Sequence, residues 1–412
     1  MQYLYTILIH LYGIAIRLAA FFNAKAKLWL EGRKKYFINL DNALKNLPPQ
    51  AKRAWFHCSS LGEFEQGRPL IEAFKQKYPE IKIILTFFSP SGYEIRKNYA
   101  GADLVLYMPL DTKRNAQKFI EKVNPSMAVF VKYDYWFNFL KVLHTQHIPT
   151  YVVSAIFRNN SMFFKWYGKW AQKYLRNFAG IFVQDTNSKE LLRSIDIQTN
   201  VTISGDTRFD RVYTIASQPQ NVELVKKFSG NQTVLIAGST WQADEELLVA
   251  LLQQIPDLKC VIAPHEIGEQ HIAGLLQKLN GKAVLFTDAS DETINTYQVL
   301  IINKIGLLAH IYPYGQLAYI GGGFGAGIHN TLEAAVFGLP LFFGTNYQKF
   351  KEAKDLIALG GAHVIRNAED LERGVNMLLQ DKEMRKTQSD ICTQYVKNNV
   401  GATKVILESI TV

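Results

Sequence analysis

Cysteine is scarce in this sequence, which has only Cys58, Cys260 and Cys392 among its 412 residues, and none of them forms a CxxC pair. This spacing argues against a disulfide framework or a cysteine-based zinc site, and it suits a reducing compartment. The sequence also has no HExxH element, no Walker lysine motif and no convincing DxD pair of carboxylates. These absences predict chemistry that uses neither a metal ion nor a cofactor.

Long internal repeats, low-complexity tracts and nucleic-acid-binding motifs are also missing. The chain is 48% hydrophobic and 20% charged, and it carries a formal net charge of +10. Such a charge suits an anionic partner, which could be a nucleic acid, a phosphorylated lipid or an acidic membrane surface. The basic residues are not interleaved with aromatic residues on one platform, so we expect no nucleic-acid partner.

The N-terminal segment is the one long apolar run, at residues 4–22, and it is interrupted by His10 and Arg17. Its length is close to what a membrane span needs, so it could cross a bilayer or lie in the interface. A cleavable signal peptide is disfavoured because no basic region precedes the run. Basic residues follow it and predict a cytoplasmic location for the rest of the chain, namely Lys25, Lys27, Arg33, Lys34 and Lys35. The alternative is a buried first helix of a soluble domain.

From about residue 52 the sequence alternates short β-rich apolar runs with segments of helical periodicity. A first series extends from RAWFHC to VTISG, and a second from TVLIAGS to AHVIR. Alternation of this kind predicts parallel sheets with helices on both faces. A chain of this length usually splits into domains. We therefore predict an α/β protein with two doubly wound domains, joined near residues 206–230.

Ligands of open α/β sheets bind beyond the carboxyl ends of the strands. The stretch SSLGEFEQGRP at residues 59–69 follows the first strand and contains Ser60 and Glu63. Ser-x-x-Glu is a capping-box pattern, in which Glu63 would bond back to Ser60. A carboxylate at this position could equally take a proton from a substrate, and the spacing does not decide between these two roles.

The second series contains a glycine-rich stretch, IGGGFGAGIHNTLEAAVFGLPLFFGTNYQKF, at residues 320–350. Its glycines allow a ligand to approach the backbone, and a helix beginning near His329 or Asn330 would direct free N–H groups at a phosphate. Glu333 lies one helical turn after Asn330 and could reach ribose hydroxyls. The alternative is that the glycines serve tight packing of strand against helix.

Ten motifs in order resemble the Kdo transferases, the 3-deoxy-D-manno-octulosonic acid transferases of lipopolysaccharide assembly. They are KAKLWLEGRKK, HCSSLGEFEQGRPLI, TFFSPSGYE, YMPLDT, KYDYWFNFL, SGDTRFDRV, AGSTWQADEE, IAPHEIGE, INKIGLLAHIY and the glycine-rich stretch. The resemblance covers essentially the whole chain. It implies a GT-B glycosyltransferase, in which two Rossmann-like domains face a cleft. The implied parts are a membrane anchor with a basic flank (1–35), an acceptor domain (36–215), a CMP-sugar domain (216–395) and a C-terminal helix that crosses back (396–412).

The resemblance also implies a reaction and its location. Kdo would pass from CMP-Kdo to a hydroxyl group of an acylated, bisphosphorylated glucosamine disaccharide, the lipid A precursor lipid IVA. The transfer would invert the sugar and need no metal, at the cytoplasmic face of a Gram-negative inner membrane. Two alternatives stay open, a GT-B transferase that uses another nucleotide sugar and a non-catalytic, membrane-anchored nucleotide-sugar sensor.

Residue by residue, the family's general base falls on Glu63, so the resemblance favours the catalytic reading of this residue. Asp134 matches a second family carboxylate and would support the transition state or cap the following helix. Lys132 stands where the family has another Glu, a reversal of charge, and Arg208 replaces a family Lys beside the departing phosphate or the Kdo carboxylate. Acceptor contacts are expected from Ser60, Gly62 and Lys132.

The donor site carries over with departures. His265 replaces a family Arg, and Leu307 replaces a carboxylate, which leaves mainly backbone contacts to the cytosine at that point. Ser239 and Thr240 would contact the donor or cap a helix. The expected CMP-donor residues are Ser239, Thr240, Pro264, His265, Ile305, Gly306, Leu307, Gly322, Gly323, His329, Asn330, Thr331, Leu332 and Glu333.

A segment rich in aromatic and basic residues, FRNNSMFFKWYGKWAQKYLR at 157–176, completes the unusual features. Phe163, Phe164 and Trp166 together with Lys165 and Lys169 could meet acyl chains and headgroups as an interfacial element. An ordinary core-facing helix with a solvated basic face would show the same composition.

Overall fold

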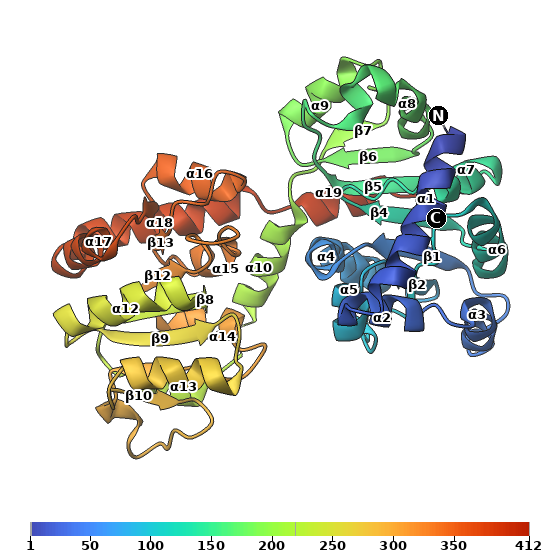
Figure 1. The fold of residues 1–412 in the computed structure, drawn as a ribbon. Coiled ribbons are helices and arrows are strands. Elements are labelled where there is room, and N and C mark those ends of the chain that lie inside the picture. Colours follow the sequence, from blue (N-terminus) through green and yellow to red (C-terminus); the bar gives the residue numbers. More distant parts are fainter. Residues whose placement is uncertain (1, 219, 412) are drawn as a thin grey trace. The chain divides into compact units, whose positions relative to one another are not determined.

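The computed structural model describes residues 2–218 and 220–411. The chain forms two compact units, one of residues 1–211 with 400–412 and the other of residues 212–399. Each is a parallel sheet flanked by helices (Figure 1). The predicted α/β class with two doubly wound domains is therefore confirmed.

The N-terminal unit contains a seven-stranded parallel sheet of order β3-β2-β1-β4-β5-β6-β7. The strand order reverses between β1 and β4, which are direct neighbours although two strands separate them in sequence. This is the topological switch point at which α/β sheets bind ligands. The strands are β1 (Arg53–Cys58), β2 (Lys82–Phe87), β3 (Leu104–Tyr107), β4 (Met127–Val131), β5 (Thr150–Ala155), β6 (Gly180–Val183) and β7 (Val201–Ile203).

Alternate side chains of this sheet enter two separate hydrophobic cores. Trp55 of β1 packs with Phe130 and Phe139 on one face, while Phe56 packs with Phe74 on the other. Burial on both faces explains why these strands are continuous apolar runs. The helices are α4 (Leu61–Lys77), α5 (Pro90–Arg96), α6 (Lys113–Val123), α7 (Phe137–Thr145), α8 (Lys169–Arg176), α9 (Thr186–Arg193) and α10 (Thr207–Ser217), the last of which continues into the second unit.

The end of the chain returns to the N-terminal unit as helix α19 (Ala402–Ser409). Ile406 and Ile410 are buried in the core beneath α4. The Asp210 carboxylate accepts hydrogen bonds from the backbone N–H groups of Gly401 and Thr403, at 2.6 and 2.7 Å. These contacts fix the start of α19, because Asp210 satisfies N–H groups that have no partner within the helix.

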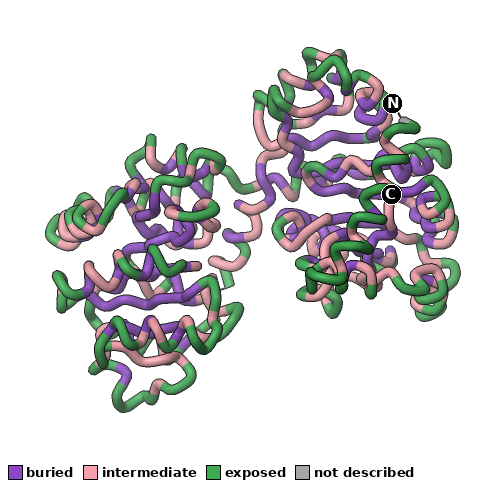
Figure 2. Tube along the Cα trace, in the orientation of Figure 1, coloured by how far each residue is buried: buried purple, intermediate pink, exposed green. Residues whose placement is uncertain are grey.

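Helix α1 (Gln2–Ala19) packs on the surface of the N-terminal unit along one side and is otherwise exposed (Figure 2). The Tyr5 hydroxyl donates to Asp111 Oδ2 at 2.5 Å, and the Tyr5 ring meets Phe137 edge-on at 5.0 Å. Its outer side presents large apolar residues: Leu4, Ile7, Leu8, Leu11, Ile14 and Leu18. None of the helices described is by itself long and apolar enough to cross a membrane, and α1 and α2 (Ala24–Glu31) reach that length only as a pair bent by 119°.

Arg33, which the sequence placed in a basic flank, is a structural residue. Its guanidinium donates to the carbonyl oxygens of Trp29, Phe88 and Met108 and lies 3.7 Å from the centre of the Trp29 ring. Burial lowers the pKa of Arg33 to about 9. The adjoining helices are α2 and α3 (Tyr36–Leu44).

The aromatic segment at 157–176 splits between core and surface. Phe163 is buried and packs edge-on against Tyr135, so it cannot take part in an interfacial element. Trp170 packs against Tyr5 and Phe137. Trp166, by contrast, is 84% exposed beside Tyr167. Only this last pair remains available for a membrane surface.

The C-terminal unit repeats the architecture with a parallel sheet of order β10-β11-β9-β8-β12-β13-β14. Its strands are β8 (Val234–Thr240), β9 (Lys259–Pro264), β10 (Ala283–Leu285), β11 (Val299–Ile301), β12 (Leu317–Ile320), β13 (Leu341–Phe343) and β14 (Ala362–Val364). Its helices are α11 (Glu223–Ser229), α12 (Gln242–Gln254), α13 (Glu269–Lys278), α14 (Leu308–Ile311), α15 (Leu332–Ala335), α16 (Lys351–Leu359), α17 (Ala368–Gln380) and α18 (Lys382–Asn398).

Candidate functional site

Glu63 lies in the first turn of α4, directly after the carboxyl end of β1. Ser60 is the N-cap of this helix, and its hydroxyl donates to Glu63 Oε2 at 3.0 Å, while the Glu63 N–H points to the same hydroxyl at 3.5 Å. The capping contact therefore forms. The Glu63 side chain is nevertheless half-buried rather than enclosed, so capping does not remove the carboxylate from solvent.

A second carboxylate, Asp134, lies beyond the end of the neighbouring strand β4 and is buried. Ser59 donates to it twice, from its N–H to Oδ2 at 3.0 Å and from its hydroxyl to Oδ1 at 2.5 Å. The loops after β1 and β4 are thus joined at the switch point of the sheet. Asp134 does not cap α7, because Asp111 accepts the N–H groups of Asn138 and Phe139 at 3.2 and 3.0 Å.

The two carboxylates influence one another. Burial, and then the charge of Glu63, raise the pKa of Asp134 well above its usual value. Burial also raises the pKa of Glu63, while bonds from Ser60 and the charge of Lys132 oppose the increase. Because two neighbouring carboxylates resist simultaneous ionisation, the buried Asp134 is the member that retains a proton, and Glu63 is the member that ionises and can act as a base.

A neutral histidine lies under this pair. His57 is fully buried, and desolvation lowers its pKa to about 3. Trp136 Nε1 donates to His57 Nε2 at 3.1 Å, which places the ring proton on Nδ1 facing Thr86 Oγ1 at 2.8 Å. The 3.5 Å approach of His57 Nε2 to Asp134 Oδ2 is therefore no ion pair.

Basic residues and one tyrosine lie near the Glu63 carboxylate. Lys132 has a left-handed backbone with φ of 70°, and its charge lowers the pKa of Glu63. Tyr133 is partly exposed; burial raises its pKa, and the charges of Arg158 and Arg208 oppose the increase. Arg208 also bonds Asp206 through Nε and Nη2, at 2.8 and 2.7 Å. The structure thus gathers the predicted residues Glu63, Asp134, Lys132 and Arg208 at one edge of the sheet.

The predicted donor residues of the C-terminal unit also meet at a sheet edge, and Asp244 organises them. This buried carboxylate accepts the N–H groups of Gly322 and Trp241, each at 2.9 Å, and the Tyr319 hydroxyl at 2.8 Å. It therefore connects the loop after β8 to the glycine loop after β12. Ser239, at the end of β8, has a left-handed φ of 55°.

Three rings stack beside this loop. Trp241 and His265 are 4.5 Å apart with planes 24° from parallel, and His265 and His329 are 4.6 Å apart at 28°. Trp241 Nε1 donates to His329 Nε2 at 3.2 Å, so the His329 proton resides on Nδ1. Burial, and then the neighbouring His265, lower the pKa of His329.

The glycine loop differs from the sequence-based expectation in two respects. Side chains at Gly321 and Gly323 would overlap the backbone of Ser239 and Gly344, so these glycines serve tight backbone packing. The helix expected from His329 or Asn330 is α15, which begins at Leu332 and spans four residues. Asn330 Oδ1 accepts the Leu332 N–H at 3.2 Å, as a capping residue does, but a helix of four residues has no long dipole to offer.

The other predicted donor residues differ in how accessible the structure leaves them. The Glu333 carboxylate accepts a hydrogen bond from Asn330 Nδ2 at 3.0 Å. The Thr331 hydroxyl is buried and has no hydrogen-bond partner among residues 2–218 and 220–411. Leu332 is a core residue whose N–H is already bonded to Asn330, so its side chain and its N–H are both occupied within the fold. Ile305 is 85% exposed next to Gly306, in the loop before α14.

Comparison of the chain with known proteins finds likenesses to one enzyme family. The family model of 3-deoxy-D-manno-octulosonic-acid transferase (Kdo transferase) matches residues 33–211. A 3-deoxy-D-manno-octulosonic acid transferase of Haemophilus influenzae is 27% identical over 386 residues, covering 88% of this chain and 86% of that one. The enzyme of the same name from Aquifex aeolicus is 24% identical over 343 residues, with coverages of 81% and 88%.

The chain is thus similar to Kdo transferases over more than four-fifths of its length. It is a glycosyltransferase. Solved structures support the GT-B fold: the UDP-GlcNAc 2-epimerase of Neisseria meningitidis, bound to UDP-GlcNAc, has a TM-score of 0.61 at 16% identity and covers 87% of this chain and 99% of its own. MurG of Acinetobacter baumannii has a TM-score of 0.56 at 11% identity, with coverages of 87% and 98%.

The residues that sequence reasoning missed are supporting ones. Ser59 holds Asp134, Trp136 orients the His57 ring next to it, and Asp244 holds the glycine loop. Asp244 had a detectable signal, because it occupies the third position of a helix that follows a strand end. His57 and Ser59 occur inside a quoted motif, but their common partner lies 75 or more residues away in the sequence.

Proposed function

We propose that this chain transfers Kdo from CMP-Kdo to a hydroxyl group of lipid IVA, the acylated, bisphosphorylated glucosamine disaccharide. The observation that carries the proposal is the half-buried Glu63 carboxylate at the switch point, beside a more deeply buried Asp134 and a lysine, in a chain similar to Kdo transferases. A base in this setting can accept a proton while its partner remains neutral.

In the proposed step the acceptor oxygen attacks the anomeric carbon of Kdo, and the bond from that carbon to the CMP phosphate oxygen breaks. CMP departs with the electron pair, Glu63 takes the acceptor proton, and the sugar configuration inverts. Arg208, with Lys132 nearby, supplies positive charge for the phosphate or the Kdo carboxylate. Transfer without a metal ion is part of this proposal.

We propose that the donor nucleotide binds at the C-terminal unit, over the edge formed by the glycine loop and the ring stack. Support comes from the convergence of Ser239, Thr240, His265, His329 and Asn330 around the loop that Asp244 holds. The unpartnered, buried Thr331 hydroxyl lies in the same loop. The ring stack offers flat surfaces and polar ring atoms at the position where the family has an arginine.

Attachment to the cytoplasmic face of the inner membrane is the third part of the proposal. Its support is the row of exposed leucines and isoleucines on α1, a helix fixed to the N-terminal unit by Tyr5 and Tyr12. An apolar face of this kind suits a helix lying in the membrane interface. The test is flotation with vesicles: replacing Leu8 and Leu11 by Ser should abolish binding, and unchanged binding would contradict the attachment.

The reaction is tested by mass spectrometry of the product formed from CMP-Kdo and detergent-solubilised lipid IVA. A mass increase by one or more Kdo residues is expected, and CMP should inhibit while UDP should not. Inhibition by UDP alone would favour another nucleotide sugar. Binding of CMP-Kdo without any product would favour a sensor.

A further inference from the structure

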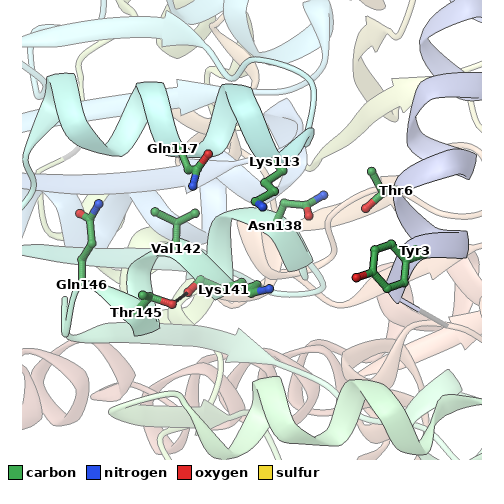
Figure 3. Close-up of a pocket in the computed structure, with 9 residues that line it drawn as sticks. All are labelled: Tyr3, Thr6, Lys113, Gln117, Asn138, Lys141, Val142, Thr145 and Gln146. Atoms are coloured by element: carbon green, nitrogen blue, oxygen red, sulfur yellow. Dashed lines mark hydrogen bonds between the residues drawn. The ribbon is translucent and has the colours of Figure 1, made fainter.

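A pocket of about 480 Å³ lies between α1, α6 and α7, away from the residues described above (Figure 3). In this view Lys113 lies next to Asn138, and Lys141 extends toward Tyr3 of α1. The lining residues come from three helices and are mostly polar: Tyr3, Thr6, Lys113, Gln117, Asn138, Lys141, Val142, Thr145 and Gln146.

The chemistry of this pocket favours an anion. Its lining offers two ammonium groups, amides and hydroxyls, and no carboxylate is found among the lining residues that the structure describes. The buried Asp111 beneath it is committed to the Tyr5 hydroxyl and to the N–H groups of Asn138 and Phe139, and burial raises its pKa to about 6. An adjoining hollow on α6 is lined by Arg114, Gln117, Lys118, Glu121 and Lys122. Lys122 is paired with Asp41 at 2.6 Å, so the additional cations of this hollow are Arg114 and Lys118.

The position of the pocket relies on helix α1. Tyr3 and Thr6 line it, and they are one turn apart on the same helix edge. The neighbouring edge presents Leu4, Ile7 and Leu11, which are exposed. A phosphate held between Lys113 and Lys141 would therefore lie beside an apolar strip that acyl chains can cover, and this combination of cations with an apolar face is what an anionic lipid requires.

We propose that this pocket binds the phosphate of an anionic phospholipid headgroup and so sets the orientation of the N-terminal unit on the membrane. The proposal rests on the membrane attachment proposed above, and it concerns bulk lipid rather than the sugar acceptor. Lys113 and Lys141 contact the phosphate, Gln117 and Thr145 border it, and α1 carries the chains.

The experiment measures affinity of the full chain for phosphatidylcholine vesicles with and without phosphatidylglycerol, with no acceptor present. We expect tighter binding of wild type to the anionic vesicles. Lys113→Gln with Lys141→Gln should weaken that binding about 30-fold, since each basic residue near an anionic surface contributes about 1 kcal/mol. Binding to neutral vesicles should not change. The matched control is Lys189→Gln with Arg193→Gln, the same charge loss on exposed positions of α9, which lies apart from α1 in Figure 1.

A third variant tests whether anionic vesicles are bound by the pocket itself or only by the positive charge of the surface. Gln117→Trp keeps both lysines but places a bulky side chain in the lining of the pocket, so it should also remove the preference for anionic vesicles. Normal selectivity of Gln117→Trp, equal losses in the α9 control, or a wild type that binds both vesicles alike would each overturn the pocket. Failure of wild type to bind any vesicle would overturn the attachment as well, whereas the transfer reaction is assayed separately with solubilised acceptor.

Discussion

Ser59 donates two hydrogen bonds to the buried carboxylate of Asp134, one from its backbone N–H at 3.0 Å and one from its hydroxyl at 2.5 Å. This pair joins the loops after β1 and β4, two adjacent strands on either side of the reversal in strand order. The contact keeps one carboxylate buried while Glu63, four residues after Ser59, stays accessible. Burial thus explains why Asp134 keeps its proton while Glu63 ionises and can act as a base.

Lys132 is expected to set the pH dependence of transfer. Its charge lowers the pKa of Glu63, so Lys132→Gln destabilises the ionised carboxylate and raises that pKa. Because a general base works only when ionised, the acidic limb of the kcat/KM profile should move to higher pH. Lys132→Arg keeps the charge and should leave the limb in place. A pH profile of both variants checks this, and a Lys132→Gln limb at the wild-type position would count against the assignment.

His57 is expected to make the N-terminal unit sensitive to acid. Its pKa is 6.5 in the unfolded chain and about 3 in the fold, so only the unfolded chain takes up the proton between these values. The free energy of unfolding should therefore fall by up to about 1.4 kcal/mol per pH unit below 6.5 through this group alone. Protonation of Asp111 and Asp134 has the opposite effect on the free energy of unfolding, because their pKa values are raised in the fold.

The comparison of wild type with His57→Gln isolates that contribution, since both proteins retain the two aspartates. Thermal unfolding should be measured from pH 7, above the unfolded-state pKa of 6.5, down to pH 4, which is still above the folded-state pKa of about 3. The variant should show a shallower pH dependence over this range. Equal slopes in the two proteins would mean that His57 is not buried in its neutral form.

Asp244 is expected to position the donor site without contacting the reacting atoms. Asp244→Ala leaves the N–H groups of Gly322 and Trp241 and the Tyr319 hydroxyl without their acceptor. The Kd for CMP should rise by about 10-fold or more, because each buried donor that loses its partner costs about 1–3 kcal/mol. Glu246→Ala, at an exposed position of the same helix, is the control. Calorimetric titration with CMP measures both, and equal affinities would contradict the role of Asp244.

The sequence allowed the fold and the positions of the sheet edges to be predicted because both depend on local patterns. Buried parallel strands are recognisable as apolar runs, and the motifs follow those runs directly. The short α15 was not predictable in this way. The helix ends at Ala335, and Gly338 takes a left-handed φ of 74° shortly afterwards, in a turn that the periodicity does not reveal.

The part of the site that depends on long-range contacts could not be read from the sequence. Ser59 and Asp134 are 75 residues apart, and Asp244 and Gly322 are 78 apart. Arg33 illustrates the opposite error, because a basic residue in a basic segment is held by three carbonyl oxygens inside the fold. Only the approach of Arg33 to Phe88 and Met108, the residues that directly follow β2 and β3, turns that cation into a structural residue.

The central claim is that Glu63 removes the acceptor proton, and kcat of Glu63→Gln tests it most directly. Gln keeps the size of the side chain and its bond to Ser60 but cannot take a proton, so kcat should fall by about 10³-fold while CMP affinity and thermal stability persist. Glu65→Gln, on the same helix and paired with Arg96 at 2.8 Å, should retain activity. A Glu63→Gln enzyme with a kcat close to wild type would contradict the account.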